Sequence, residues 1–376
     1  MQILNLNSRV IIENGITEKL EEILKKKKFK RALFCIDNGF FNSKIWNKYE
    51  KIFKKIKFQE LIINCNSEPT YNLLNFYLSK VRKMKIDVVV AFGGGSCMDY
   101  SKAIAALYNK KGHPIKFRGF DKVKKPGIPC ICIPTTAGTG SEASHNASFV
   151  DTKKKIKMGI NGNNMFTELS ILDAKNVVSC PKKAAISSAV DAFVHAVEGF
   201  SCKKSNQFTD LLAIEVLRLF KISVLDLNKK KPNLKKRLNL LYAAYLSGII
   251  QMNSGSGISS AMSYPLSAIY KVPHGIGGGI FILDVVDYNI KNGYSKYKLI
   301  SKHLNLKKNS SKSFLMYFKN VFKKLNVPTK LSYFKITHNQ VNTLYKKTIL
   351  MQNSFDQNPV KFDIRKNYKN FIKKYL

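Results

Sequence analysis

The sequence lacks the segments that would place a protein in a membrane or send it out of the cell. No apolar run approaches the ~20 residues that a helix needs to cross a bilayer, and one of the longest, Leu240 to Leu246, covers only about two helical turns. The N-terminal segment MQILNLNSRVII alternates as a strand does and lacks the basic-then-apolar order of a signal peptide. We therefore expect a cytoplasmic protein without a membrane partner.

Cysteine pairs of the metal-binding or redox type are also missing. None of the seven cysteines belongs to a CxxC pair, and most of them lie in apolar segments. Cys130 and Cys132 are two residues apart in an apolar strand, where alternation points both thiols to the same face. We expect buried, reduced thiols rather than a disulfide framework or a thiolate metal site.

Acidic residues are scarce, since 24 Asp and Glu stand against 64 Lys and Arg and leave a net charge of +40. Such a charge can serve nucleic-acid binding. However, only seven of the basic residues are arginine, the side chain that reads phosphate and guanine with two hydrogen bonds. The lysines are spread evenly along a chain rich in Asn and Ile, as an AT-rich genome would produce, and no nucleic-acid module is recognisable. No nucleic-acid partner is predicted.

The apolar pattern divides the 376 residues into two parts near residue 178. In the first part, short apolar strands alternate with helical segments, and this alternation implies a parallel sheet built from βαβ units. The predicted strands span 31–37, 58–65, 86–92, 129–134 and 169–173, with a helix over 71–84. The second part is helical by pattern, over 183–200, 206–225, 235–252, 258–270, 294–304 and 311–325 and near the C-terminus. We predict an α/β domain over 1–178 and an all-α domain over 179–376, with a cleft between them.

A glycine-rich turn, Gly93-Gly94-Gly95, joins a predicted strand to a helical segment. Successive glycines let an anion approach the backbone, and the following helix N-terminus offers free N–H groups. Ser96 and Asp99 have the spacing of an N-cap and an N3 residue, so each can satisfy an amide of that helix. The turn can cradle a pyrophosphate or can be a plain strand-to-helix turn, and it is not the GxGxxG fingerprint.

A second glycine turn, PTTAGTGSEAS, follows the next predicted strand. The hydroxyls of Thr135, Thr136 and Thr139 can hydrogen-bond to a phosphate, a ribose or a carboxamide, and Ser141 is a further candidate in the same turn. Two such turns at adjacent strand ends of a parallel sheet define one crevice. The pair favours a nucleotide-binding site.

Asp191 and His195 are four residues apart in an apolar-periodic helix, so both side chains lie on one face. A carboxylate and an imidazole one turn apart can bind a divalent cation together. The same spacing also occurs in pairs that are merely hydrogen-bonded.

Four ordered motifs, GGGSCMDYSKAIA, PTTAGTGSEAS, DAFVHAVEGF and YKVPHGIGGGI, resemble those of the iron-containing (group III) alcohol dehydrogenase family over roughly residues 30–290. The resemblance implies the fold shared with dehydroquinate synthase, an N-terminal dinucleotide-binding α/β domain and a C-terminal helical domain with Fe²⁺ or Zn²⁺ in the cleft. It implies an NAD(P)-dependent oxidoreductase that interconverts a small-molecule alcohol with an aldehyde or ketone, and a homodimer. Lyase chemistry like that of dehydroquinate synthase ranks low, because the DxxxH and PHG motifs look dehydrogenase-like.

The resemblance also assigns two nucleotide-binding residues. Asp37, at the end of an early strand, matches an acidic residue that faces the adenosine ribose, where a carboxylate favours NAD over NADP. Its alternative role is to start a turn before Asn-Gly. Lys155 matches a lysine near the nucleotide, in a register that the neighbouring lysines leave open.

Three metal ligands are implied in the same way: Asp191, His195 and His274. Ser260 stands where the family has a fourth ligand, a histidine, and Tyr264 stands where many members have a second histidine that assists proton transfer. Because a serine hydroxyl is a poor ligand, we expect a three-ligand catalytic centre with open positions, in which Tyr264 and Ser260 move the proton.

Two alternatives remain at this stage: a metal-independent dehydrogenase in which Tyr264 polarises the carbonyl, and a non-catalytic nucleotide-binding relative. The substrate is not identified by the sequence. The hydroxyls of Ser260, Ser263 and Tyr264 would make the cleft polar, which favours a polyhydroxylated or anionic substrate.

Overall fold

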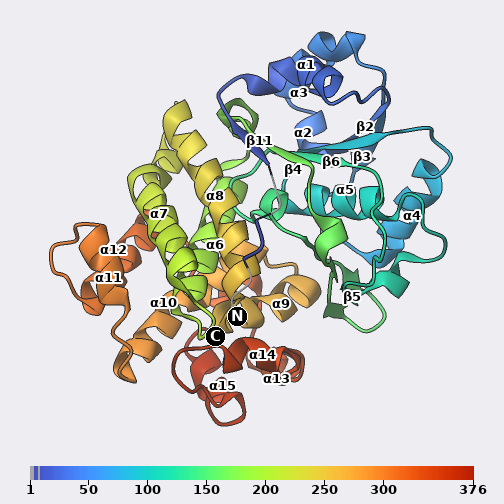
Figure 1. Ribbon diagram of the computed structural model, residues 1–376. Coiled ribbons are helices and arrows are strands. Elements are labelled where there is room, and N and C mark those ends of the chain that lie inside the picture. Colours follow the sequence, from blue (N-terminus) through green and yellow to red (C-terminus); the bar gives the residue numbers. More distant parts are fainter. Residues whose placement is uncertain (1–3, 7–8) are drawn as a thin grey trace.

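The computed structural model describes residues 4–6 and 9–376. A parallel sheet with helices on both faces forms one part of the molecule, and a part made of packed helices lies beside it (Figure 1). The six strands of the sheet follow the order β1-β11-β6-β4-β2-β3, and all neighbouring pairs are parallel. They are β1 (Val10–Ile12), β2 (Ala32–Asp37), β3 (Phe58–Ile63), β4 (Val88–Gly93), β6 (Cys130–Pro134) and β11 (Leu169–Leu172). The predicted fold class is confirmed, and the boundary at residue 178 stays a prediction.

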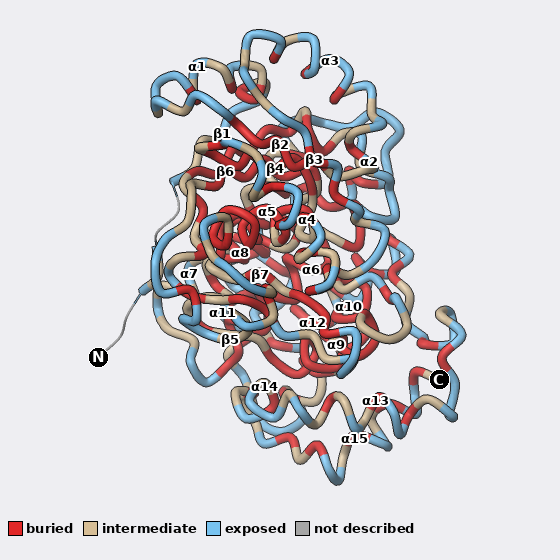
Figure 2. Tube along the Cα trace, turned by 90° about the vertical axis from the view of Figure 1, so that its right-hand side faces the viewer, coloured by how far each residue is buried: buried red, intermediate tan, exposed pale blue. Residues whose placement is uncertain are grey.

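Both faces of the sheet are buried, which explains why its strands are continuous apolar runs. The side chains of one face, such as Leu33, pack with α4 (Tyr71–Val81) and α5 (Gly95–Leu107). Those of the other face, such as Phe34, pack with helices α1 (Leu20–Lys26), α2 (Asn38–Phe41) and α3 (Lys44–Ile52). Figure 2 shows the buried interior that results.

Five of the seven cysteines are buried, whereas Cys65 and Cys180 are partly exposed. Cys130 and Cys132 point to the same face of the sheet, both are buried, and their sulfur atoms lie 4.0 Å apart. All seven cysteines are free thiols.

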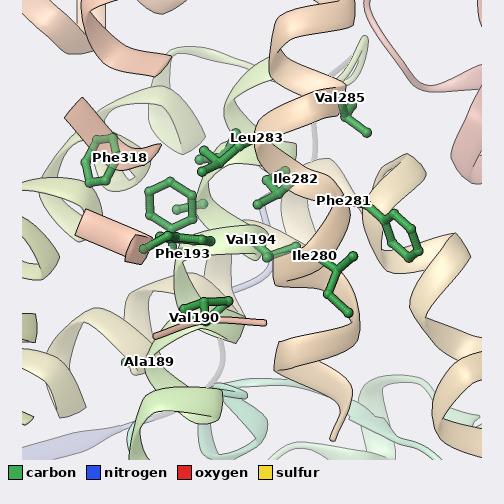
Figure 3. Packing of buried hydrophobic residues seen from close by; sticks show 14 of the residues in the cluster. Ala189, Val190, Phe193, Val194, Ile280, Phe281, Ile282, Leu283, Val285 and Phe318 are labelled. Atoms are coloured by element: carbon green, nitrogen blue, oxygen red, sulfur yellow. The ribbon is translucent and has the colours of Figure 1, made fainter. Parts of the chain in front are cut away.

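The helical part packs around α6 (Lys182–Ser201), whose apolar side chains enter one large core. Figure 3 shows Val190, Phe193 and Val194 of α6 between α10 and Phe318, and the rings of Phe193 and Phe318 are 4.7 Å apart. The other helices are α7 (Gln207–Ser223), α8 (Leu234–Ser254), α9 (Ile258–Tyr270), α10 (His274–Lys291), α11 (Tyr297–His303), α12 (Ser311–Lys324), α13 (Val341–Thr348), α14 (Gln352–Asp356) and α15 (Ile364–Lys373). No helix of the described residues is long and apolar enough to cross a membrane.

Helix α10 is not predicted by the sequence pattern, because glycines crowd its first two turns and glycine disfavours helix. The structure explains them by close packing against α6. A Cβ atom on Gly275 would lie 2.0 Å from the carbonyl oxygen of Ser187, and one on Gly279 would lie 2.5 Å from a methyl carbon of Val190. The glycines therefore let α10 approach α6 closely enough for the first residue of α10 to meet the side chains of α6.

Two small sheets are formed by short strands between residues 119 and 161. One contains β5 (Gly119–Phe120), β10 (Ile160–Asn161) and β7 (Asn146–Ala147). The other is a hairpin of β8 (Val150–Asp151) and β9 (Ile156–Lys157). Strand β9 packs on α9, so this hairpin connects the sheet part of the molecule to the helical part.

Candidate active site

The carboxyl ends of β2, β4 and β6 bring the predicted nucleotide-binding residues together. Asp37 ends β2 and Gly93 ends β4, and a Cβ atom on Gly93 would lie 3.0 Å from the Cβ of Asp37. The backbone N–H of Thr135, just after β6, donates to the carbonyl of Gly93 at 3.0 Å. These ends lie at the sheet edge where open parallel sheets bind their ligands.

The two glycine turns are in direct contact. A Cβ atom on Gly94 would lie 2.9 Å from the hydroxyl oxygen of Thr136, and one on Gly95 would lie 2.6 Å from the methyl carbon of Thr139. Gly94, Gly95 and Ser96 remain partly exposed. The turns therefore form one cradle, with backbone on one side and threonine hydroxyls on the other.

The predicted capping by Ser96 and Asp99 is wrong. Helix α5 begins at Gly95 with Gly94 as its N-cap, so Ser96 lies inside the first turn and no side chain caps the helix. The uncapped N–H groups stay free for an anion. Asp99 instead accepts hydrogen bonds from the Ser141 hydroxyl at 2.5 Å and from the Ser148 N–H at 2.8 Å. Asp99 and Ser141 thus fasten one turn to the other.

A buried lysine that the sequence analysis did not single out supports the same cradle. Lys102 is 1% exposed, and its ammonium group donates to the carbonyl oxygens of Ser141 at 2.7 Å, Ser144 at 3.2 Å and Asn146. It lies 3.6 Å from the Asp99 carboxylate. A lysine on the apolar face of a predicted helix was the signal that could have revealed it.

The carboxylate of Asp37 lies at the end of β2. One of its carboxylate oxygens accepts from the N–H groups of Gly39 and Phe40, at 2.8 and 3.1 Å, and so caps α2. The turn-starting role is therefore present. Because the side chain is only partly buried, its other oxygen can still meet a ribose hydroxyl.

Lys155 lies in solvent at the turn of the β8–β9 hairpin, with a left-handed φ of +52°. Lys157, two residues later, is only partly exposed, and its side chain is 7% exposed. Its ammonium group lies 2.7 Å from Glu68 and 5.4 Å from the ring centre of Tyr264. Burial opposes the charged form of Lys157, but Glu68 and Tyr264 outweigh this effect and raise its pKa. In this geometry Lys157, rather than Lys155, faces the site.

Asp191, His195 and His274 converge. Asp191 and His195 lie one turn apart on α6, and His274 is the first residue of α10. One possible ligand atom from each of the three lies within 4.8 Å of the other two, and Asp191 Oδ1 is 3.6 Å from His195 Nε2. Gly275 holds this arrangement, because α10 could not come so close to Asp191 with a larger residue there.

The chemistry of the three groups fits a divalent cation. His195 is 4% exposed, yet neither of its ring nitrogens has a hydrogen-bond partner among the described residues. Buried ring nitrogens without a hydrogen-bond partner are rare in proteins, and a bound ion is one explanation for them. Burial lowers the pKa of His274 to about 3, with Lys157 acting in the same direction, so its imidazole is neutral and keeps a free electron pair. One carboxylate and two neutral imidazoles are a common ligand set for catalytic zinc or iron.

The hydroxyl of Ser260 is directed at a second buried carboxylate, Glu198. It donates to Glu198 Oε2 at 2.6 Å, while the N–H groups of Gly257 and Ser260 donate to the two oxygens at 2.8 and 2.9 Å. Burial raises the pKa of Glu198, and these donors oppose the rise. Glu198 is not among the predicted residues, although it lies one turn after His195 on the same apolar helix.

Tyr264 borders the three converging side chains. Its ring centre is 5.3 Å from that of His274, with Lys157 on another side. Burial raises the pKa of Tyr264, and Lys157 opposes this rise. The phenol therefore keeps its proton at neutral pH.

The cradle and the three converging side chains are neighbours. A Cβ atom on Gly138, in the second glycine turn, would lie 2.3 Å from the carbonyl oxygen of Ser188. Ser188 lies one turn before Asp191 on α6. A cofactor in the cradle can thus extend one end towards Asp191.

Known proteins share both parts of this architecture. Residues 7–174 match the family model described as iron-containing alcohol dehydrogenase, and residues 185–374 match the C-terminal model of the Fe-containing alcohol dehydrogenase family. Alcohol dehydrogenase 4 of Saccharomyces cerevisiae is 27% identical over 321 residues, 84% of each chain. An alcohol dehydrogenase of Thermococcus barophilus is 29% identical over 343 residues, 87% of each chain.

A solved structure shows the same fold over the whole chain. Sulfoacetaldehyde reductase from Bifidobacterium kashiwanohense, in complex with NAD⁺, has a TM-score of 0.88 at 20% identity and covers 99% of this chain and 98% of its own. Together with the matches to both family models, the resemblance seen in the four sequence motifs is confirmed. The chain belongs to the iron-containing alcohol dehydrogenase family.

Proposed function

We propose that this enzyme uses Asp191, His195 and His274 to hold its divalent cation and Tyr264 to move the proton of the reaction. As a member of its family, the protein is an NAD-dependent alcohol dehydrogenase that interconverts an alcohol with an aldehyde or ketone. The observation that carries the proposal is the contact between Gly138 and Ser188, which puts the nucleotide cradle one helical turn from Asp191. Hydride donor and carbonyl can therefore meet beside the three ligands.

The two glycine turns bind and orient the cofactor. The free N–H groups at the start of α5 suit its pyrophosphate, and the hydroxyls of Thr136 and Thr139 lie opposite them. The partly buried carboxylate of Asp37 favours a ribose with a free 2′-hydroxyl, so we assign NAD rather than NADP. The hydride chemistry itself is that of the nicotinamide.

The three ligands carry one negative charge, so a bound dication keeps a net positive charge at the site. Held by these residues, iron or less favourably zinc would supply Lewis-acid chemistry, which polarises a substrate oxygen and lowers the pKa of an alcohol. Tyr264 holds a proton on its phenol oxygen and gives it to the substrate oxygen during reduction, when hydride reaches the carbon. Lys157 then stabilises the phenolate that remains. In alcohol oxidation the same proton moves back to Tyr264.

Ser260 has a smaller part in this scheme than its position suggests. Its hydroxyl hydrogen is committed to Glu198 at 2.6 Å, so Tyr264 rather than Ser260 is the proton donor. We infer that Ser260 leaves the position of a fourth protein ligand unfilled. The hydroxyls of Ser260 and Ser263 are both engaged within the protein, so the polarity of the site comes from the Tyr264 phenol and the cation of Lys157. These two groups support a polyhydroxylated or anionic substrate.

Replacing His274 by Ala tests the proposal. We expect the purified variant to lose its bound iron or zinc, and NAD-linked turnover of a panel of alcohols to fall ~1000-fold or more, which corresponds to ~4 kcal/mol of transition-state stabilisation. NAD affinity should change less than twofold, because the cradle is untouched. The matched control is His303→Ala at the exposed end of α11, which should leave metal content and turnover unchanged.

Unchanged metal content and turnover in His274→Ala would contradict the metal assignment. Wild-type protein that binds metal and NAD but turns over no alcohol or aldehyde would instead identify a non-catalytic relative.

We also propose that the enzyme acts as a homodimer in the cytoplasm. Seven free thiols fit a reducing compartment. The short strand β1 (Val10–Ile12) lies at the edge of the sheet, where its unpaired backbone groups can meet a second chain. Light scattering coupled to size-exclusion chromatography would read a mass twice the 42.7 kDa of the chain.

A further inference from the structure

A fully buried serine on α9 touches one of the three converging side chains. The hydroxyl oxygen of Ser263 lies 2.8 Å from the carbonyl oxygen of Ser260 and 3.0 Å from Nδ1 of His274. A hydroxyl has one hydrogen, so it donates to one of these two atoms and can only accept from the other.

The distances decide which way the hydrogen points. A carbonyl oxygen cannot donate, and two oxygen acceptors would repel each other at 2.8 Å if the Ser263 hydrogen pointed to His274. The hydrogen therefore goes to the carbonyl of Ser260, and the Ser263 oxygen accepts from Nδ1–H of His274. This leaves Nε2 as the nitrogen of His274 with a free electron pair.

The carbonyl of Ser260 is itself held in place. The N–H and the hydroxyl of Ser260 both donate to Glu198, at 2.9 and 2.6 Å. Glu198 lies on α6, the helix that carries Asp191 and His195. A continuous chain of hydrogen bonds thus runs from α6 through the first turn of α9 to His274 at the start of α10.

We propose that Ser263 is a positioning residue that fixes His274 as the Nδ1–H tautomer and so presents Nε2 to the cation beside Asp191 and His195. This inference rests on the proposed function, since it concerns the same ligands. Helix α9 thus orients a metal ligand, His274, without supplying a ligand of its own. A neutral imidazole without this acceptor would distribute its proton over both nitrogens, and only one of the two forms can bind the cation through Nε2.

The first test reads the tautomer directly, in metal-free protein. The chain has only six histidines, so ¹⁵N-labelled histidine gives a resolvable set of signals, and His274→Gln identifies the one that matters. In the wild type we expect a protonated Nδ1 and a bare Nε2 for His274. In Ser263→Ala we expect the two nitrogen shifts to move towards a mixture. A bare Nδ1 in the wild type would overturn the proposal.

The second test measures affinity by titration with Co²⁺, whose visible spectrum reports its ligands. Ser263→Ala should bind Co²⁺ ~10–100-fold more weakly, as is usual when an outer hydrogen bond to a ligand is removed. Ser267→Ala is the matched control, because Ser267 is also buried on α9 and also donates to the carbonyl three residues before it, that of Tyr264, at 3.1 Å. This control should keep the wild-type affinity and spectrum.

Equal affinity in Ser263→Ala and the wild type, or equal losses in Ser263→Ala and Ser267→Ala, would contradict a specific role for Ser263. If Ser263→Ala does not fold, the wild-type tautomer alone decides. The tautomer is read without metal, NAD or substrate. A failure of the proposed function would therefore show as absent metal binding with the tautomer intact, whereas a failure of this inference would show as the wrong tautomer in an active enzyme.

Discussion

The nucleotide cradle and the helical centre are built by different means. In the cradle, each turn is a contiguous strand–turn–helix or strand–turn segment, and the N–H groups at the start of α5 have no side-chain cap. In the centre, side chains from α6 and α10 meet although they are far apart in sequence, and their meeting depends on how closely two helices pack. Local geometry fixes the first, whereas tertiary packing fixes the second. The two regions should therefore respond separately to substitution.

The largest difference between the responses of the two regions is expected from Gly275→Ala in the helical centre. Its Cβ atom would lie 2.0 Å from a backbone oxygen, that of Ser187, which cannot move aside as a flexible side chain can. We expect α10 to shift from α6, with a loss of ~3 kcal/mol in the free energy of unfolding and loss of bound metal. Urea denaturation and metal analysis measure these effects.

Gly278→Ala on the same helix is the control for this prediction. Its nearest neighbour would be the Val194 side chain at 3.3 Å, so the cost is small and is offset by a gain in helix propensity of up to ~1 kcal/mol. Similar losses in both variants would mean that glycine content, and not the contact with Ser187, decides the stability of the centre.

A gain is expected from Ser260→His, the position where the family resemblance implies a histidine ligand. A fourth ligand should raise metal affinity by more than ~10-fold, which is the smallest effect usual for an outer hydrogen bond to a ligand. We expect this gain although the hydrogen bond from Ser260 to Glu198 is lost. Competition with a chelator measures the affinity, and NAD binding should not change. Ser260→Ala, which removes the same hydroxyl without adding an imidazole, should show no gain; equal behaviour of the two variants would refute the idea of an unfilled ligand position.

The smallest effect is expected in the cradle, from Gly95→Ala. Its Cβ atom would meet the methyl carbon of Thr139 at 2.6 Å, and a side chain can yield where a backbone cannot. We expect NAD to bind about tenfold more weakly, ~1.4 kcal/mol, with metal content unchanged. Calorimetric titration measures this, and adding Thr139→Ser in the same chain, which removes the methyl carbon and keeps the hydroxyl, should restore most of the affinity. No recovery in the double variant would place the clash elsewhere.

The same contrast explains how much could be predicted from the sequence. The cradle followed from local patterns, and the strand ending at Asp37 and helix α9 at 258–270 lie where the periodicity placed them. Helical spacing placed Asp191 and His195 on one face of a helix, but their assignment as ligands needed the family resemblance. His274 needed the family resemblance, because nothing local indicates that α10 returns to α6.

Three features were beyond the sequence for physical reasons. Helix α10 was missed because propensity disfavours its glycines, and only the facing atoms of α6 explain them. The capping by Ser96 was wrong because the helix begins at Gly95 without a side-chain cap. Lys157 was passed over for Lys155, since in a run of lysines only the hairpin geometry shows which side chain is shielded from solvent.

The contact between Gly138 and Ser188 has a practical consequence for changing the substrate range. It joins two backbones without an adjustable side chain between them. Side-chain substitutions therefore cannot readily change the distance between the nicotinamide and α6. Room for a bulkier or smaller substrate is more readily changed where α9 meets the β8–β9 hairpin, at Tyr264 and Lys157. Libraries aimed at new alcohols should therefore vary that region and leave α6 intact.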